Sequence, residues 1–284
     1  MEYKVRKGIY LKDKNNTYNM IYTMLITTIP FIILSTIYNG IYPVINGEGS
    51  LYTVFKPLIF VVVSSLTNIL TEYLYYLLKQ KKKSINYLLT ESFAIIPGVL
   101  LSIITPLNTP LYILILGSFI SSIYKLLVGG FAKNKLNTTL IGYLVIFIYN
   151  YNNYTLIVGP YEIITNILSV GVLIYLIIKE NIKYRIPLYS ILTILILSLI
   201  LNINIYNLLS GYILFQLILI APDNITSPLS HRGQLVGGIL LGIISFLLIN
   251  ITNINETIFL AILVFNMLTM IINYITIKVY SSNL

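Results

Sequence analysis

The residues best suited to chemistry lie in one polar stretch, Ala221 to Gln234, between two long apolar segments. It contains Asp223, Thr226, Ser227 and two prolines. Proline interrupts helices, and backbone freed at membrane depth must find partners in protein, water or a ligand. A carboxylate and two hydroxyls at such a break could hold an ion or the polar edge of a small molecule. Ordinary connecting turns use the same residue types, so both interpretations stay open at this point.

A second interruption runs from Thr105 to Pro110. Its Asn108-Thr109-Pro110 lies 118 residues before Thr226-Ser227-Pro228, and Asn137-Thr138-Thr139 lies the same distance before Asn255-Glu256-Thr257. This spacing favours two repeat halves, approximately 18–155 and 156–284, each with an odd number of spans and therefore inverted relative to each other. We expect the two interruptions to approach each other's repeat and to frame the functional site.

The composition defines the elements that must position these residues. Hydrophobic residues make up 57% and charged residues 10% of the 284 residues, against roughly 45–50% and 25% in soluble domains. Runs rich in Leu, Ile and Tyr predict helices, because barrel strands alternate in segments of about 10 residues. We predict an all-α polytopic membrane protein with about ten transmembrane helices. The apolar stretches are 18–43, 52–79, 86–104, 110–129, 136–151, 161–179, 187–202, 205–221, 235–251 and 256–278.

The net charge of +9 is explained by where Lys and Arg lie relative to the membrane, so it does not indicate binding of nucleic acid. Lys and Arg cluster in the basic segment 1–17 and after every second apolar stretch, whereas the alternate loops carry none. Cytoplasmic loops carry the excess of Lys and Arg. We therefore predict one transmembrane domain, 18–284, in the plasma membrane with both termini cytoplasmic. The cations after the even-numbered stretches are Lys81–Lys83, Lys133, Lys135, Lys179, Lys183, Arg185 and Arg232.

Acidic residues near or inside spans are candidates for an ion pathway, because a charge in the bilayer is costly. For Glu91, Glu162, Asp223 and Glu256, a hydrated carboxylate at the end of a span is at least as good an interpretation. Glu72 lies deeper and could pair with a lysine or face a cavity. Lys125 is expected to extend to the cytoplasmic surface. The candidates are Glu72, Glu91, Glu162 and Glu256, besides Asp223.

The sequence has too few Cys and His residues for thiol chemistry or a transition-metal site. The chain has no Cys and a single His. Disulfides, iron–sulfur ligation within the chain and a transition-metal site are therefore not predicted.

Several motifs resemble one family of membrane proteins. Besides the Asp223 stretch, they include Glu91-Ser92-Phe93-Ala94, Pro106-Leu107-Asn108-Thr109-Pro110, Gly129-Gly130-Phe131-Ala132-Lys133-Asn134-Lys135-Leu136-Asn137 and Tyr184-Arg185-Ile186-Pro187. Their order and spacing are similar to those of RnfD, from Rnf electron-transport complexes, and of NqrB, from the sodium-translocating NADH:quinone oxidoreductase. The resemblance covers most of the chain after about residue 84.

That resemblance also raises the question of flavin. Family members typically carry flavin mononucleotide (FMN) linked to a threonine of a Ser-Gly-Ala-Thr-Pro sequence between the fifth and sixth spans. The connection from Asn150 to Glu162 lacks this motif, so covalent FMN is predicted to be absent. FMN or riboflavin bound without a covalent link stays possible. The candidate residues are Asn108, Thr109, Asn134, Asn137, Asp223, Thr226 and Ser227.

Three functions are compatible with these observations. The resemblance implies a membrane component of an Rnf- or NQR-type complex, which couples flavin-mediated electron transfer to Na⁺ or H⁺ movement and is not catalytic alone. Other membrane and flavin-carrying subunits would be its partners. The alternatives are a stand-alone transporter or channel with inverted repeats and a flavin-free structural subunit.

Overall fold

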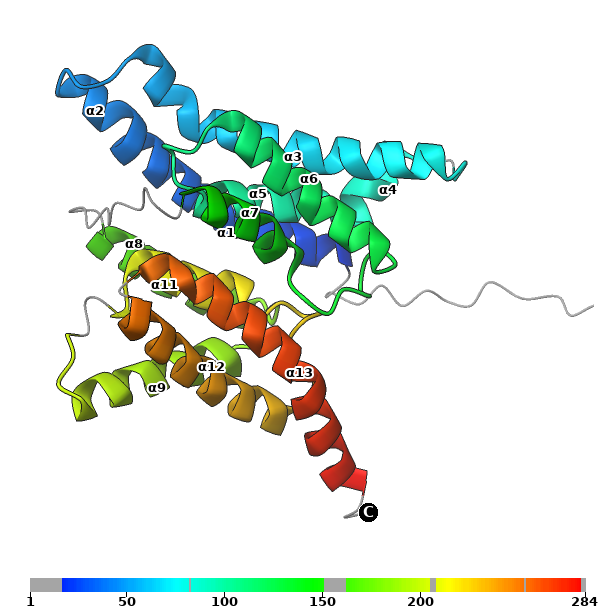
Figure 1. Cartoon of the computed structure of the whole chain (residues 1–284), viewed down its shortest axis with the longest axis vertical. Helices are drawn as coiled ribbons and strands as arrows, with labels where there is room; N and C mark the ends of the chain where they lie inside the picture. The colour runs from blue at the N-terminus through cyan, green and yellow to red at the C-terminus, as the bar shows by residue number, and fades with distance from the viewer. Residues whose placement is uncertain (1–16, 82, 151–161, 205–207, 253, 282–284) are drawn as a thin grey trace, which may run out of the picture.

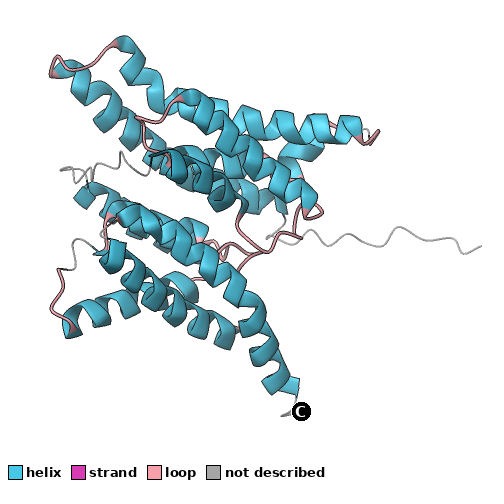
Figure 2. Cartoon of the chain, in the orientation of Figure 1, coloured by secondary structure: helices cyan, strands magenta, loops and turns pink. Residues whose placement is uncertain are grey.

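Apolar runs broken by proline, glycine and small polar residues fold into helices of very different length. A computed structural model describes residues 17–81, 83–150, 162–204, 208–252 and 254–281. Figure 2 shows helices joined by loops throughout the described residues, without a strand. The first half contains α1 (Thr17–Ser35), its π-helical continuation Thr36–Ile41, α2 (Tyr42–Ile45), α3 (Leu51–Leu78), α4 (Ile85–Thr90), α5 (Ile95–Ile104), α6 (Leu111–Leu127) and α7 (Thr138–Asn150).

The second half continues with helices of different lengths. In Figure 1 it forms the lower group of helices, beneath the first half. The predicted stretch 86–104 differs, because a non-helical turn between α4 and α5 divides it. The helices of the second half are α8 (Glu162–Ile178), α9 (Arg185–Ile200), α11 (Gly211–Phe215) with the π-helix η2 (Gln216–Ile220), α12 (His231–Thr252), the short 3₁₀ turn η3 (Asn255–Thr257) and α13 (Ile258–Ser281).

Hydropathy and burial identify a membrane protein. Four helices are long and apolar enough to cross a bilayer, namely Tyr22–Ile45, Leu51–Leu78, His231–Thr252 and Asn255–Thr276, and six shorter apolar helices accompany them. Large apolar side chains such as Leu70 and Ile251 are exposed, whereas Ser64, Asn68 and Glu72 are buried. This distribution suits a lipid environment, where polar groups face the protein interior. That ten segments cross the bilayer stays a prediction.

The helices of each half pack closely on one another. In the first half α3 packs on α6, α6 on α7 and α1 on α5; in the second, α9 packs on α12, α12 on α13 and α8 on α11. Glycines allow the closest contacts. A Cβ on Gly142 would lie 2.6 Å from the Gly117 carbonyl oxygen, and one on Gly242 would lie 2.7 Å from that of Ser190. Small residues permit such close approach between membrane helices.

The two shortest of the six shorter apolar helices cover only about half of the bilayer. α5 has 10 residues, and α11 with η2 covers Gly211–Ile220. At 1.5 Å per residue each is about 15 Å long, half of the roughly 30 Å hydrocarbon core. The chain continues from each as a polar break. The first break is Thr105–Pro110, the second break is Asp223–Pro228, and the fold places one in each half.

Candidate functional site

The first break largely satisfies its own backbone. The Thr105 hydroxyl donates to the Leu101 carbonyl at 2.6 Å, and the Thr109 N–H donates to the Pro106 carbonyl at 3.0 Å. One side chain reaches it from another helix: Asn150 Nδ2, at the end of α7, donates to Thr109 Oγ1 at 2.8 Å. Pro110 then precedes α6, where its missing N–H costs no helical hydrogen bond.

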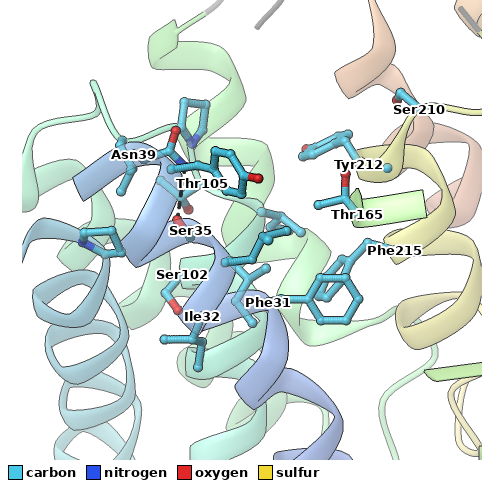
Figure 3. Close-up of a pocket in the computed structure, with 18 of the residues that line it drawn as sticks. Phe31, Ile32, Ser35, Asn39, Ser102, Thr105, Thr165, Ser210, Tyr212 and Phe215 are labelled. Carbon is cyan, nitrogen blue, oxygen red and sulfur yellow. Dashed lines mark hydrogen bonds between the residues drawn. The ribbon is translucent and has the colours of Figure 1, made fainter. Parts of the chain in front are cut away.

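A cavity of about 260 Å³ lies beside the first break; we call it the Thr105 cavity. Figure 3 shows its two walls. Phe31, Ser35, Asn39 and Thr105 come from the first half, and Thr165, Ser210, Tyr212 and Phe215 come from the second. The Phe31 and Phe215 rings meet edge to face, with centroids 4.8 Å apart. The first break therefore faces helices of the other half.

The polar lining of the Thr105 cavity suits a cation. Glu162 and Glu256 line it, and its described lining contains no Lys or Arg. The Glu256 Oε2 atom is buried without a hydrogen-bond partner, and so is the Ser210 hydroxyl, on a side chain that is 2% exposed. Burying such groups unpaired is costly, and an ion, a proton or water would satisfy them.

The second break is tied down more firmly. Asp223 accepts from the Thr226 hydroxyl at 3.1 Å, and its own carbonyl accepts from the Ser227 hydroxyl at 2.6 Å. The Lys183 ammonium, from the α8–α9 loop, donates to the Asn224 carbonyl and to both oxygens of Ser227 at 3.0–3.1 Å. Burial lowers the pKa of Lys183, and the Asp223 charge partly offsets this effect.

Two asparagines connect the second break to the first half. Asn137 Nδ2 donates to the Ile220 carbonyl at 3.4 Å, and the Asn137 backbone N–H donates to Asn266 Oδ1 at 3.0 Å. Asn266 Nδ2 in turn donates to the Thr226 carbonyl at 3.4 Å. Asn137 also caps α7, because its Oδ1 accepts from the Thr139 N–H at 3.0 Å. The start of α7 and the second break are thus one hydrogen-bonded unit.

A cavity of about 230 Å³, the Asp223 cavity, lies beside the second break. Residues 222–225 form one side, and Phe93, Phe131, Asn134 and Asn137 of the first half line it as well. The rings of Phe93 and Phe131 are stacked, with centroids 4.3 Å apart and planes 10° apart. This cavity combines a flat aromatic surface with side-chain amides.

Next to the Asp223 cavity lies a buried ion pair. Lys125 Nζ and Glu72 Oε1 are 2.6 Å apart, with side chains 5% and 1% exposed. The Ser92 hydroxyl donates to Glu72, and Lys125 donates to the Ser92 carbonyl. Our expectation that Lys125 extends to the cytoplasmic surface is therefore wrong. A buried carboxylate keeps the ammonium inside, because separating the two would leave each charge unpaired.

The predicted site residues divide between the two cavities, whereas we predicted a single shared site. Asn108 lines the Thr105 cavity with Glu162 and Glu256. Asn134, Asn137 and Asp223 line the Asp223 cavity. Thr109, Thr226 and Ser227 are buried and form hydrogen bonds within the breaks. Glu72 belongs to the buried ion pair. Glu91 is exposed at the end of α4 and lines neither cavity.

Other residues of the site escaped sequence reasoning. Lys183 looked like one more cytoplasmic cation, and Asn150 and Asn266 are single amides inside apolar helices. Isolated amides in apolar helices are a usable signal, because polar residues at this depth form hydrogen bonds between helices. The connection predicted to lack covalent flavin falls on residues 151–161, which lie outside the described residues.

The fold and the buried polar breaks define a polytopic helical membrane protein. Residues 4–166 and 156–281 match the model of the NQR2, RnfD, RnfE family. The chain belongs to this family.

Individual relatives are distant. The RnfD-type component of the ion-translocating oxidoreductase complex from Shigella dysenteriae serotype 1 is 34% identical over 113 residues, 39% of this chain and 32% of that protein. Its counterpart from Escherichia coli O7:K1 is 26% identical over 168 residues, 59% of this chain and 43% of that protein. The matched segments thus span less than half the length of these relatives.

Proposed function

We propose that the protein is a membrane component of an Rnf- or NQR-type complex that couples flavin-mediated electron transfer to Na⁺ or H⁺ movement. Family membership and the similarity to RnfD proteins support the class of complex. One observation carries the proposal to particular residues: each helix break lines a cavity together with the other half of the chain. Inverted-repeat transporters place substrates and ions at such discontinuous helices.

The Thr105 cavity is proposed as part of the ion pathway. Two carboxylates line it, one of them with an unpartnered buried oxygen. On the topology derived from the loop charges, the first break faces the outer side and the second the cytoplasm. An ion would then meet Glu162 and Glu256 at one end of the protein and Asp223 at the other.

The Asp223 cavity is proposed to bind a flavin without a covalent link. Its stacked Phe93 and Phe131 suit a planar ring, and Asn134 and Asn137 offer amide groups to a polar ring edge. At about 230 Å³ it is slightly smaller than the roughly 300–1,000 Å³ of typical ligand pockets, so it suits a ring system better than a whole nucleotide. A bound flavin would supply one- and two-electron chemistry, and the residues of this chain would orient it and exclude water.

Other subunits must supply the electrons, because the sequence contains no recognisable nicotinamide site or iron–sulfur ligand. Purification in mild detergent is expected to recover further membrane or flavin-carrying subunits. Recovery of a homomer that catalyses electron transfer alone would contradict this part of the proposal.

The ion pathway is tested by Glu256→Gln and Asp223→Asn in the assembled complex, with exposed Glu91→Gln as the matched control. The first two substitutions remove a charge and keep the size, so Na⁺ or H⁺ uptake driven by electron flow is expected to fall while assembly is retained. Unchanged uptake in both would refute the assignment. For the flavin, gel fluorescence after denaturation should show no band in this chain, whereas flavin retained in the native protein would indicate non-covalent binding.

A further inference from the structure

The turn between α4 and α5 contains an aromatic residue in a backbone conformation that such residues rarely adopt. Phe93 has φ +58°, in the left-handed region where a bulky side chain is a true outlier. Three other non-glycine residues with positive φ, namely Gln80, Glu180 and Asn202, directly follow helix ends, where this conformation closes the last turn. The turn at Phe93 is wider than the turns at these three helix ends. The N–H of the next residue, Ala94, donates to the carbonyl of Leu88, six residues earlier.

Two buried side chains hold Ser92, the neighbour of Phe93. Lys125 donates to the Ser92 carbonyl, and the Ser92 hydroxyl donates to Glu72, which is itself paired with Lys125 at 2.6 Å. The contacts come from two long helices, α3 and α6, so Ser92 is fixed from both sides. A strained residue persists where its surroundings over-determine it, and such residues cluster at functional sites.

The strained backbone turns the Phe93 ring toward a partner. Phe93 stacks on Phe131, and both line the Asp223 cavity opposite the second break. Ala132, next to Phe131, also has positive φ, at 66°. The stacked pair of Phe93 and Phe131 therefore lies at two residues with positive φ, Phe93 and Ala132. Neither of them closes the last turn of a long helix, unlike Gln80, Glu180 and Asn202.

We propose that Glu72, Lys125 and Ser92 are positioning residues that hold Phe93 against Phe131 and so shape the aromatic wall on which a planar ring ligand stacks in the Asp223 cavity. The ligand class rests on the proposed flavin function, but the positioning role does not. Phe93 and Phe131 are the rings that would contact the ligand, and the ion pair acts on them through Ser92. Lys125 also lines the Asp223 cavity, so the positioning role is judged by the mobility of position 93 and not by ligand affinity alone.

The same helix pair provides a control for this role. The Ser122 hydroxyl of α6 donates to Asn68 Oδ1 of α3 at 2.6 Å, one turn of α3 before Glu72. Both side chains are buried, and the hydrogen bonds of this pair do not involve Ser92. Replacing either pair by apolar residues removes a buried polar interaction between α3 and α6, but only one replacement releases Ser92.

The test uses tryptophan as a probe, because the chain contains none. In Phe93→Trp, the steady-state fluorescence anisotropy of the single Trp reports its mobility without any ligand. We compare the double variant Glu72→Leu/Lys125→Met with the control Asn68→Leu/Ser122→Ala. Removing both charges together avoids leaving one of them buried and unpaired. Ser92→Ala is a milder third variant that creates no unpaired charge. Phe119→Trp, on a side chain 46% exposed on α6, is the reference probe.

The expected result is lower anisotropy at position 93 in the ion-pair variant and, to a smaller degree, in Ser92→Ala, with no change in the control variant or at position 119. Riboflavin affinity without the probe should fall about tenfold in the ion-pair variant, a loss of about 1.4 kcal/mol. Equal anisotropy in the ion-pair and control variants would overturn the positioning role. If the ion-pair variant fails to fold, the result for Ser92→Ala decides. Should the unmodified protein bind no riboflavin, the flavin proposal fails, while the anisotropy still decides the positioning role.

Discussion

The two breaks each come after a short helical segment, yet they are held in different ways. Within the described part of the chain, the first break receives one side-chain hydrogen bond from another helix, that of Asn150 to Thr109. The second is held by Lys183 and Asn266, and Asn137 in turn holds Asn266 and the nearby Ile220 carbonyl. The less tethered break lines the cavity whose buried polar atoms lack partners, and the firmly tethered break lines the cavity with stacked rings.

This difference fits the two proposed roles, an ion site at the first break and a site for a planar ring at the second. A site that passes a hydrated or partly hydrated ion benefits from polar groups left available for it. A site that orients a rigid ring benefits from backbone fixed by several hydrogen bonds. Weakening these hydrogen bonds one at a time tests this difference, because stability should fall most at the break that has the most of them.

Lys183→Met is expected to have the largest effect. It removes one charge and three hydrogen bonds, and it leaves the Asn224 and Ser227 carbonyls without this donor. A buried acceptor left unsatisfied costs about 1–3 kcal/mol, and these hydrogen bonds are partly buried, so we expect the unfolding free energy to fall by about 2–4 kcal/mol in total. The measurement is the thermal stability of the purified protein in detergent.

The control for this substitution is Lys179→Met. Lys179 belongs to the same basic loop region but is exposed, and its ammonium lies 5.9 Å from the centre of the Tyr175 ring. Exposed substitutions usually change stability by about 0.5 kcal/mol or less. If both lysine variants melted at the same temperature, the tether from Lys183 to the second break would be of no energetic importance.

Asn266→Ala is expected to have an intermediate effect. It removes the acceptor of the Asn137 N–H and the donor to the Thr226 carbonyl, which together join the halves. A loss of about 1–3 kcal/mol is expected, with faster proteolysis at the second break as a second measurement. Asn250→Ala is the matched control, because the hydrogen bond that Asn250 makes within the described residues goes to Phe246 of its own helix. Equal behaviour of the two variants would contradict a link between the halves at this point.

The sequence predicts the helical class and the places of both breaks, because composition, proline and loop charge are local signals. Asp223 is predicted from the second break, whereas Asn134 and Asn137 are predicted from the motif that resembles the family; all three line one cavity. The sequence could not single out Lys125 as the partner of Glu72, since their pairing depends on which faces of α3 and α6 meet. The tethers of Lys183 and Asn266 likewise arise only when the halves pack together.

The smallest effect is expected for Asn150→Ala, at the first break. It removes a single hydrogen bond to Thr109, worth about 1 kcal/mol. Since the first break otherwise closes through its own Thr105 and Thr109 contacts, it should loosen without unfolding the protein. The chain has no Cys, so a cysteine at exposed Asn108 provides a specific probe, and its reaction with a polar thiol reagent should be faster in Asn150→Ala. A destabilisation as large as that of Lys183→Met would mean that both breaks are held equally, and the contrast between the halves would no longer stand.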